Sequence, residues 1–176
     1  MATLSKSQIE TALSRLGEMA ARAGSPIRLV LVGGGAMVLA FGARESTRDL
    51  DVAILAPADH AAVRMMAERV AQELQWRSDW LNDAAKGFLV GLSVGPVIFA
   101  SNGIEVLRPA TEQLLAMKLC AWRDDLDISD ARRLLDELTG NQQEVWKRVV
   151  PFLQPGEELK AQYAFEDLWS TTNDHD

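Results

Sequence analysis

The chain has 176 residues, of which 48% are hydrophobic and 24% are charged, a composition that is ordinary for a globular protein and argues against disorder along its whole length. Because domains commonly contain about 100–200 residues, the length predicts a single domain over residues 1–176. The net charge of −7 argues against a protein that coats nucleic acid, although a local basic patch with bound magnesium would still allow a nucleic-acid substrate.

Residue counts and hydropathy argue against a zinc protein, a membrane-spanning protein and a secreted protein. The chain has one cysteine and two histidines, too few for a zinc centre built on these residues. No apolar stretch approaches the roughly 20 residues that cross a bilayer, and residues 1–10 lack the basic start and apolar middle of a signal peptide. We therefore expect a cytoplasmic protein with no membrane partner.

Apolar periodicity and end signals predict helices and strands that alternate along the chain. Strands are expected over residues 27–32, 49–55, 97–100 and 104–108. Helices are expected over residues 5–23, 36–42, 109–123, 129–138, 141–153 and 156–169. A further crossover helix is expected to begin at Pro57, with an apolar stripe that ends at Leu74. This alternation predicts an α/β or α+β fold.

Two stretches carry weaker signals. Between the crossover helix and residue 96, the composition fits a short helix over 80–86. Residues 88–94 are compatible with either a strand or a loop. The last residues, 170–176, are expected to form a polar tail.

Three consecutive glycines, Gly33, Gly34 and Gly35, follow the first predicted strand. A strand, a tight turn and a helix start aim several backbone N–H groups at one point, a geometry that suits an anion. The run does not fit a dinucleotide fingerprint, because Val38 stands where that pattern needs its last small residue. It does not fit a P-loop either, since no Gly-Lys-Ser/Thr follows, and a bare glycine turn is the alternative.

Two aspartates, Asp49 and Asp51, open the second predicted strand. Side chains alternate across a strand, so both project from the same face with α-carbons roughly 6.6–7 Å apart. They could be the polar edge of a strand, but two unneutralised carboxylates beside a core are costly, and a bound Mg²⁺ would offset that cost. The pair therefore predicts a metal site.

The glycine run, together with the segment from Arg44 to Asp51, resembles the signature of the nucleotidyltransferase superfamily, which has the DNA polymerase β-like fold. More narrowly, it is similar to small bacterial nucleotidyltransferase-like proteins related to the AbiEii toxins. The resemblance covers roughly residues 27–135. It implies a mixed sheet of about 4–5 strands flanked by helices, with a core at about 27–123 and a helical C-terminal extension at about 127–170.

The resemblance also implies roles at the predicted site. Gly33, Gly34 and Gly35 would bind the phosphates of an NTP, while Asp49 and Asp51 would hold Mg²⁺ or Mn²⁺ in a two-metal scheme. That scheme needs a third carboxylate on an adjacent strand, and Glu105 is the only acid in the next strand pair. An exposed strand residue is the alternative reading of Glu105.

Further candidates lie on either side of this core. The resemblance makes Lys118 a triphosphate ligand, and a lysine stem that reaches solvent is the alternative. The remaining candidates could bind the nucleotide, contact the acceptor or support the site, and they are Arg44, Thr47, Arg48, Arg123, Asp127 and Asp130. For the arginines the alternative is local salt bridges, and for Asp127 and Asp130 it is a solvated acidic helix face.

The implied activity is Mg²⁺-dependent transfer of NMP from ATP or another NTP to a hydroxyl group. Its acceptor would be a tRNA or a protein, as for a toxin of a toxin–antitoxin system with a cognate antitoxin. One alternative enzyme modifies a small molecule such as an antibiotic. A different class of function is a catalytically degenerate binding or antitoxin subunit with the same fold.

Overall fold

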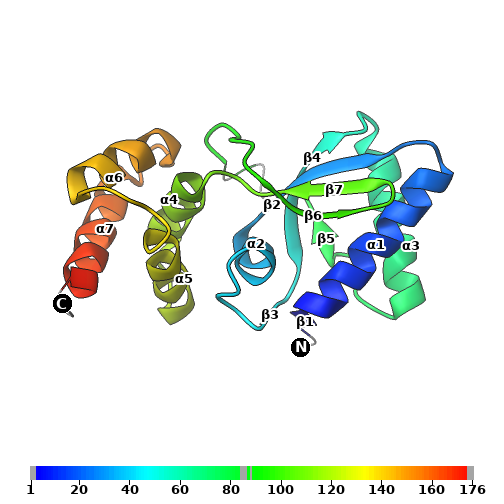
Figure 1. Cartoon of the computed structure of the whole chain (residues 1–176), viewed down its shortest axis with the longest axis horizontal. Helices are drawn as coiled ribbons and strands as arrows, with labels where there is room; N and C mark the ends of the chain where they lie inside the picture. Colours follow the sequence, from blue (N-terminus) through cyan, green and yellow to red (C-terminus); the bar gives the residue numbers. More distant parts are fainter. Residues whose placement is uncertain (1–2, 84–86, 88, 174–176) are drawn as a thin grey trace. The chain divides into compact units, whose positions relative to one another are not determined.

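A central strand, β2 (Ile27–Val32), is almost completely buried and pairs with a strand on each side. The computed structural model describes residues 3–83, 87 and 89–173. These residues divide into two compact units (Figure 1). The sheet unit holds the described residues of 1–87 and 94–109, and the helical unit holds those of 88–93 and 110–176.

The sheet unit contains β2 together with short and long strands and three helices. Its other strands are β1 (Leu4–Ser5), β3 (Ser46–Thr47), β4 (Leu50–Ala56), β5 (Leu81–Asn82), β6 (Val97–Ser101) and β7 (Ile104–Leu107). Its helices are α1 (Lys6–Arg22), α2 (Gly33–Leu39) and α3 (His60–Leu74).

The main sheet has the strand order β5-β4-β2-β7-β6, and β1 pairs separately with β3. Strand β2 is antiparallel to β4 and parallel to β7, so the predicted mixed α/β sheet is confirmed. The register places Val32 opposite Asp51 at one end of β2 and Arg28 beside Glu105 at the other. This register decides which predicted site residues meet.

Helices α1 and α3 pack against each other and lie on the sheet (Figure 1). A Cβ atom on Gly17 of α1 would come within 2.5 Å of the Ile104 side chain, so glycine lets this helix approach β7 closely. Arg15 of α1 donates to Glu73 of α3 at 2.6 Å, and Ser5 and Gln8 form a capping box that begins α1. The helix predicted over 5–23 is thereby confirmed.

The helical unit consists of α4 (Thr111–Ala121), α5 (Asp125–Leu135), α6 (Gln142–Val149), the 3₁₀ turn η2 (Val150–Phe152) and α7 (Glu158–Asn173). Helix α4 contacts each of the others. Trp146 of α6 stacks on Phe165 of α7 with ring centroids 5.0 Å apart. The ammonium of Lys160 donates to the carbonyls of Cys120 and Ala121, which would otherwise lack partners at the end of α4.

Several predicted boundaries are wrong for identifiable reasons. Helix α3 begins at His60 rather than Pro57, because Asp59 caps it, and α5 begins at Asp125 rather than residue 129, because Asp124 caps it. The helix expected over 36–42 begins earlier, at Gly33. The helix expected over 141–153 changes to a 3₁₀ turn at Val150.

Two weaker predictions also need correction. Within the stretch expected as a helix over 80–86, Leu81–Asn82 is the strand β5, and 84–86 lie outside the described residues. The described part of 88–94 is neither helix nor strand, Phe88 being outside it. The expected tail is helical to Asn173, and 174–176 are outside the described residues. No helix of the described residues is both long and apolar enough to cross a membrane.

Candidate active site

The three glycines form the first turn of α2, directly after β2, and we call Gly33–Gly35 the glycine elbow. Gly33 has φ +60°, a left-handed conformation that glycine adopts without the steric cost of a side chain. Val32 is the N-cap, and no side chain caps this helix start. The first N–H groups of a helix have no acceptor inside the helix, so backbone donors gather here.

Each glycine of the elbow has a different neighbour. A Cβ atom on Gly33 would lie 3.2 Å from Asp51 Oδ2, and one on Gly34 would lie 2.6 Å from Thr47 Oγ1. A Cβ atom on Gly35 would instead meet the Leu50 side chain at 2.8 Å. Glycine is therefore required at Gly35 for core packing, while Gly33 and Gly34 face polar groups.

Thr47 connects the elbow to the acid pair. Its side chain lies beside Gly34, and its hydroxyl donates to the carbonyl of Asp49 at 3.2 Å. Thr47 is held in place by β3, where it pairs with Leu4 of β1. Arg44 Nη1 also lies 3.4 Å from the Cβ position of Gly34. The structure thus brings Arg44, Thr47 and Gly34 together.

The acid pair spans the start of β4. Asp51 is in the strand, opposite Val32, whereas Asp49 precedes it, and both are half-buried. Burial raises the pKa of the Asp49 carboxyl, and the nearby charge of Asp79 raises it further, while Arg77 and Arg48 oppose the shift. The ionised form of Asp49 is therefore disfavoured mainly by burial, a cost that a bound cation would offset.

Sequence reasoning missed the segment that adjoins the acid pair. The backbone carbonyl of Trp80 accepts a hydrogen bond from the backbone N–H of Leu50 at 2.7 Å. Strand β5 follows and pairs with β4 in parallel register, which places Asn82 beside Asp51. Arg77 forms an ion pair with Asp79 in the same segment. The only sequence signal was the pair of tryptophans flanking these charges, and strands of two residues leave no periodicity to detect.

Glu105 lies elsewhere on the sheet. Its carboxylate accepts from Arg28 Nε at 2.6 Å, and both side chains are partly exposed. Arg28 is four residues along β2 from Val32, the partner of Asp51, which is roughly 13 Å at the rise of a strand. The expectation that Glu105 completes the metal site is therefore not met, because the register puts it at the opposite end of β2.

The donor set fits one divalent ion that also binds substrate. Within the described part of the chain, no three acidic, histidine or cysteine side chains gather as a metal-binding cluster. Mg²⁺, however, is commonly held by one or two carboxylates together with substrate phosphates. Asp51 offers one such carboxylate beside the glycine elbow, and Asp49 lies two residues before it, whereas a two-metal scheme with three sheet carboxylates does not fit.

Lys118 belongs to a separate cluster inside the helical unit. Its ammonium lies 3.1 Å from Asp127 Oδ1 and 2.7 Å from Asp130 Oδ2, and both carboxylates are only 2% exposed. Burial alone would raise the pKa of Asp127, but the hydrogen bond from Arg123 and the charge of Lys118 hold it below its usual value. The alternative of a solvated acidic helix face is therefore wrong, because both acids are buried in ion pairs with Lys118 and, for Asp127, also with Arg123. The role of Lys118 as a triphosphate ligand stays a prediction.

A comparison with protein families covers both units. The profile of a family described as "nucleotidyltransferase of unknown function (DUF6036)" matches residues 8–140, about three quarters of the chain. The match includes every predicted site residue, from Gly33 to Asp130, and ends before α6. No curated protein matches the sequence. The fold, the elbow with its acid pair and the family match together show that this chain belongs to the DUF6036 family of nucleotidyltransferases.

Proposed function

We propose that this chain transfers a nucleoside monophosphate from ATP or another NTP to a hydroxyl acceptor, with Mg²⁺ or Mn²⁺ bound at Asp49 and Asp51. The acceptor oxygen forms a bond to the α-phosphorus, and the bond from that phosphorus to the β-phosphate oxygen breaks. Pyrophosphate leaves, and the hydroxyl proton passes to solvent. The nucleotidyltransferase family supplies the reaction class.

The observation that carries the proposal is the position of Asp51 Oδ2, 3.2 Å from where a Cβ atom of Gly33 would be. The elbow offers backbone donors to an anion, and the carboxylate is itself an anion. The carboxylate would repel a phosphate in the same corner, and a cation between the two negative groups would offset that repulsion. This juxtaposition is what a metal–triphosphate requires.

Different residues of the chain would bind the metal ion and the phosphates. Asp49 and Asp51 hold the divalent ion, which when bound neutralises phosphate charge in the transferring group. The elbow leaves Gly33 and Gly34 without side chains, so that phosphate oxygens reach the backbone N–H groups. Arg44, beside Gly34, and Arg48, near Asp49, add positive charge for a polyanion.

The direct test is transfer of label from each α-³²P-labelled NTP in the presence of Mg²⁺. Total tRNA, a cell-protein fraction and a cationic aminoglycoside are supplied in separate reactions, because the acceptor can be an RNA, a protein or a small molecule. We expect Asp51→Asn to reduce transfer at least 100-fold. The matched control is Asp167→Asn, an exposed acid of α7, which should behave as wild type. Equal transfer by wild type and Asp51→Asn would contradict the proposal.

A second candidate function is a nucleotide-binding subunit that does not catalyse, such as an antitoxin component. The observation that favours it is the position of Glu105, which leaves two carboxylates at the described site. This candidate predicts NTP binding that Asp51→Asn abolishes, with no label transferred to any acceptor. A toxin with a cognate antitoxin predicts transfer that the antitoxin suppresses.

A further inference from the structure

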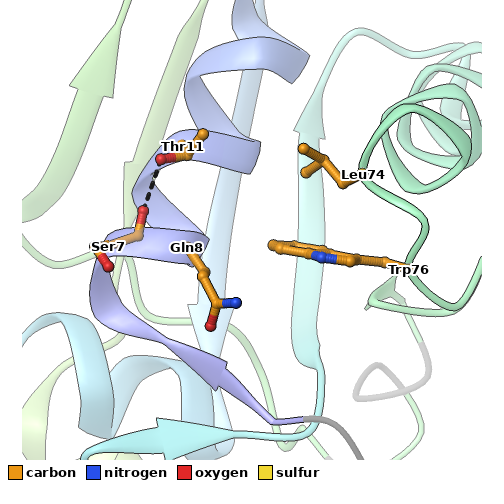
Figure 2. A pocket seen from close by; sticks show the side chains of 5 residues that line it. All are labelled: Ser7, Gln8, Thr11, Leu74 and Trp76. Atoms are coloured by element: carbon orange, nitrogen blue, oxygen red, sulfur yellow. Dashed lines mark hydrogen bonds between the residues drawn. The ribbon is translucent and has the colours of Figure 1, made fainter.

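A hollow of about 290 Å³ lies in the sheet unit, between the first turns of α1 and the C-terminal end of α3 (Figure 2). Its lining consists of Ser7, Gln8, Thr11, Leu74 and Trp76. Ligand pockets commonly measure about 300–1,000 Å³, so this hollow suits a single flat ring system better than a whole nucleotide.

The lining chemistry selects a neutral, flat ligand. None of the five side chains is charged, so a phosphate would find no counter-charge among them. The indole of Trp76 and the side chain of Leu74 project toward α1 and offer an aromatic and apolar surface (Figure 2). Aromatic side chains are the usual stacking platforms for nucleobases, because every base has a π-face.

The polar side of the hollow is oriented by the start of α1. Gln8 Oε1 accepts the backbone N–H of Ser5 at 2.9 Å, which fixes the amide and leaves its nitrogen on the side of Trp76 (Figure 2). The Thr11 hydroxyl donates to the carbonyl of Ser7 at 2.8 Å, so its oxygen remains available as an acceptor. The hollow therefore presents a donor and an acceptor beside an aromatic face, as the edge of a base requires.

Short chain segments connect both walls of the hollow with residues of the candidate active site. Gln8 is three residues after Ser5, the end of β1, whose Leu4 pairs with Thr47 beside the glycine elbow. Trp76 begins the segment that ends at Trp80, where the carbonyl accepts from Leu50 between the two site aspartates. Each wall of the hollow is therefore only a few residues along the chain from a residue that contacts the candidate site.

We propose that this hollow is the base subsite of the proposed nucleotidyltransferase, in which the nucleobase of the bound NTP stacks on Trp76 and accepts a hydrogen bond from the Gln8 amide. The inference rests on the proposed function and deepens it, since it names residues that bind the nucleoside rather than the phosphates.

The test compares ligands with and without a base. The affinities of the full chain for ATP, CTP, GTP, UTP and inorganic tripolyphosphate are measured by calorimetry with Mg²⁺. We expect Trp76→Ala to weaken the best NTP about 10-fold, as loss of one stacked base does, and to leave tripolyphosphate unchanged. Trp76→Phe keeps an aromatic face and should retain most of the affinity.

Gln8→Glu tests the amide separately. Glutamate keeps the oxygen that accepts from Ser5 and preserves the capping box, but it replaces the donor nitrogen. We expect a loss of NTP affinity larger than any loss for tripolyphosphate, which reports the effect of the added charge alone. Thermal melting of each variant confirms that the fold is intact.

Each outcome separates this proposal from the function on which it rests. Asp51→Asn should weaken tripolyphosphate and NTP alike, and its failure to do so would refute the proposed function. Unchanged NTP affinity in Trp76→Ala, or equal losses for NTP and tripolyphosphate, would overturn the base subsite while leaving the phosphate site standing. A wild-type chain that binds neither ligand refutes both.

Discussion

Asp51 and Gly33 lie against each other, because the antiparallel register of β2 and β4 places the aspartate opposite Val32, the residue before the glycine. A side-chain carbon on Gly33 would come within 3.2 Å of the Asp51 carboxylate. The elbow and the acid pair are thus one structural feature, and substitutions can separate its effects on folding from its effects on function.

Gly33→Ala should abolish nucleotidyl transfer and lower stability by about 1 kcal/mol, the cost of a left-handed backbone for a residue with a Cβ atom. The matched control is Gly24→Ala, since Gly24 has nearly the same φ of +64° but nothing within 4 Å of its Cβ position. Both variants should melt at similarly reduced temperatures, and only Gly33→Ala should lose activity. Comparable activity in the two variants would mean that the elbow does not bind phosphate.

Glu105→Gln should leave transfer within about twofold of wild type, because Glu105 pairs with Arg28 rather than with the acid pair. The stability change should stay below about 1 kcal/mol, since exposed ion pairs contribute little. Steady-state kinetics at several Mg²⁺ concentrations provide the measurement. A loss of activity that excess Mg²⁺ restores would show that Glu105 is a metal ligand after all.

Asp49→Asn should raise the melting temperature at neutral pH. Burial and Asp79 raise the pKa of Asp49 in the folded protein, so the folded state binds this proton more tightly than the unfolded state does. Ionisation of Asp49 therefore lowers stability as the pH rises above its ordinary pKa of 3.8. The gain from asparagine should vanish below that pH, where the carboxyl is protonated in both states.

Mg²⁺ gives this prediction a second readout. A bound cation offsets the charge of Asp49, so Mg²⁺ should raise the melting temperature of wild type more than that of Asp49→Asn. Equal shifts in the two proteins would contradict the placement of the ion at Asp49, and a wild type more stable than the variant at neutral pH without Mg²⁺ would contradict the raised pKa of its carboxyl.

Lys118→Met should cost about 3–5 kcal/mol, because it leaves Asp127 and Asp130 buried without their shared cation. Denaturant unfolding measures the loss, and Lys147→Met, at an exposed lysine of α6, should change stability by less than about 0.5 kcal/mol. Replacing both aspartates by asparagine as well should recover much of the stability, since no buried charge then remains.

The same cluster predicts acid sensitivity. The lowered pKa of Asp127 means that its ionised form stabilises the fold above pH 3.8, the ordinary value, and that this stability is lost as the pH falls through the lowered value. Lys118→Met should therefore melt with a weaker dependence on pH in this range than wild type. An unchanged pH dependence would show that the Lys118 pair does not set the pKa.

Local signals in the sequence were enough for most of the elements. The capping residues of α1, the apolar run of β2 and the turn between β6 and β7 act between near neighbours, so periodicity and end signals identify them. The glycine run and the aspartate pair could be associated with each other from their order along the chain alone. The α/β fold class followed from the order of these elements, and the resemblance to the nucleotidyltransferase superfamily followed from the glycines and aspartates; the narrower likeness to the AbiEii toxins stays a prediction.

Contacts between distant segments were decided only by the tertiary structure. The sequence pointed to Glu105 as the only acid in the following pair of predicted strands, but strand register places it beside Arg28, and register is not encoded in the spacing of one strand. The burial of Asp127 and Asp130 around Lys118 depends on how α4 and α5 pack. The hollow at Gln8 and Trp76 exists because α1 and α3 meet on one sheet, so no local pattern could have revealed it.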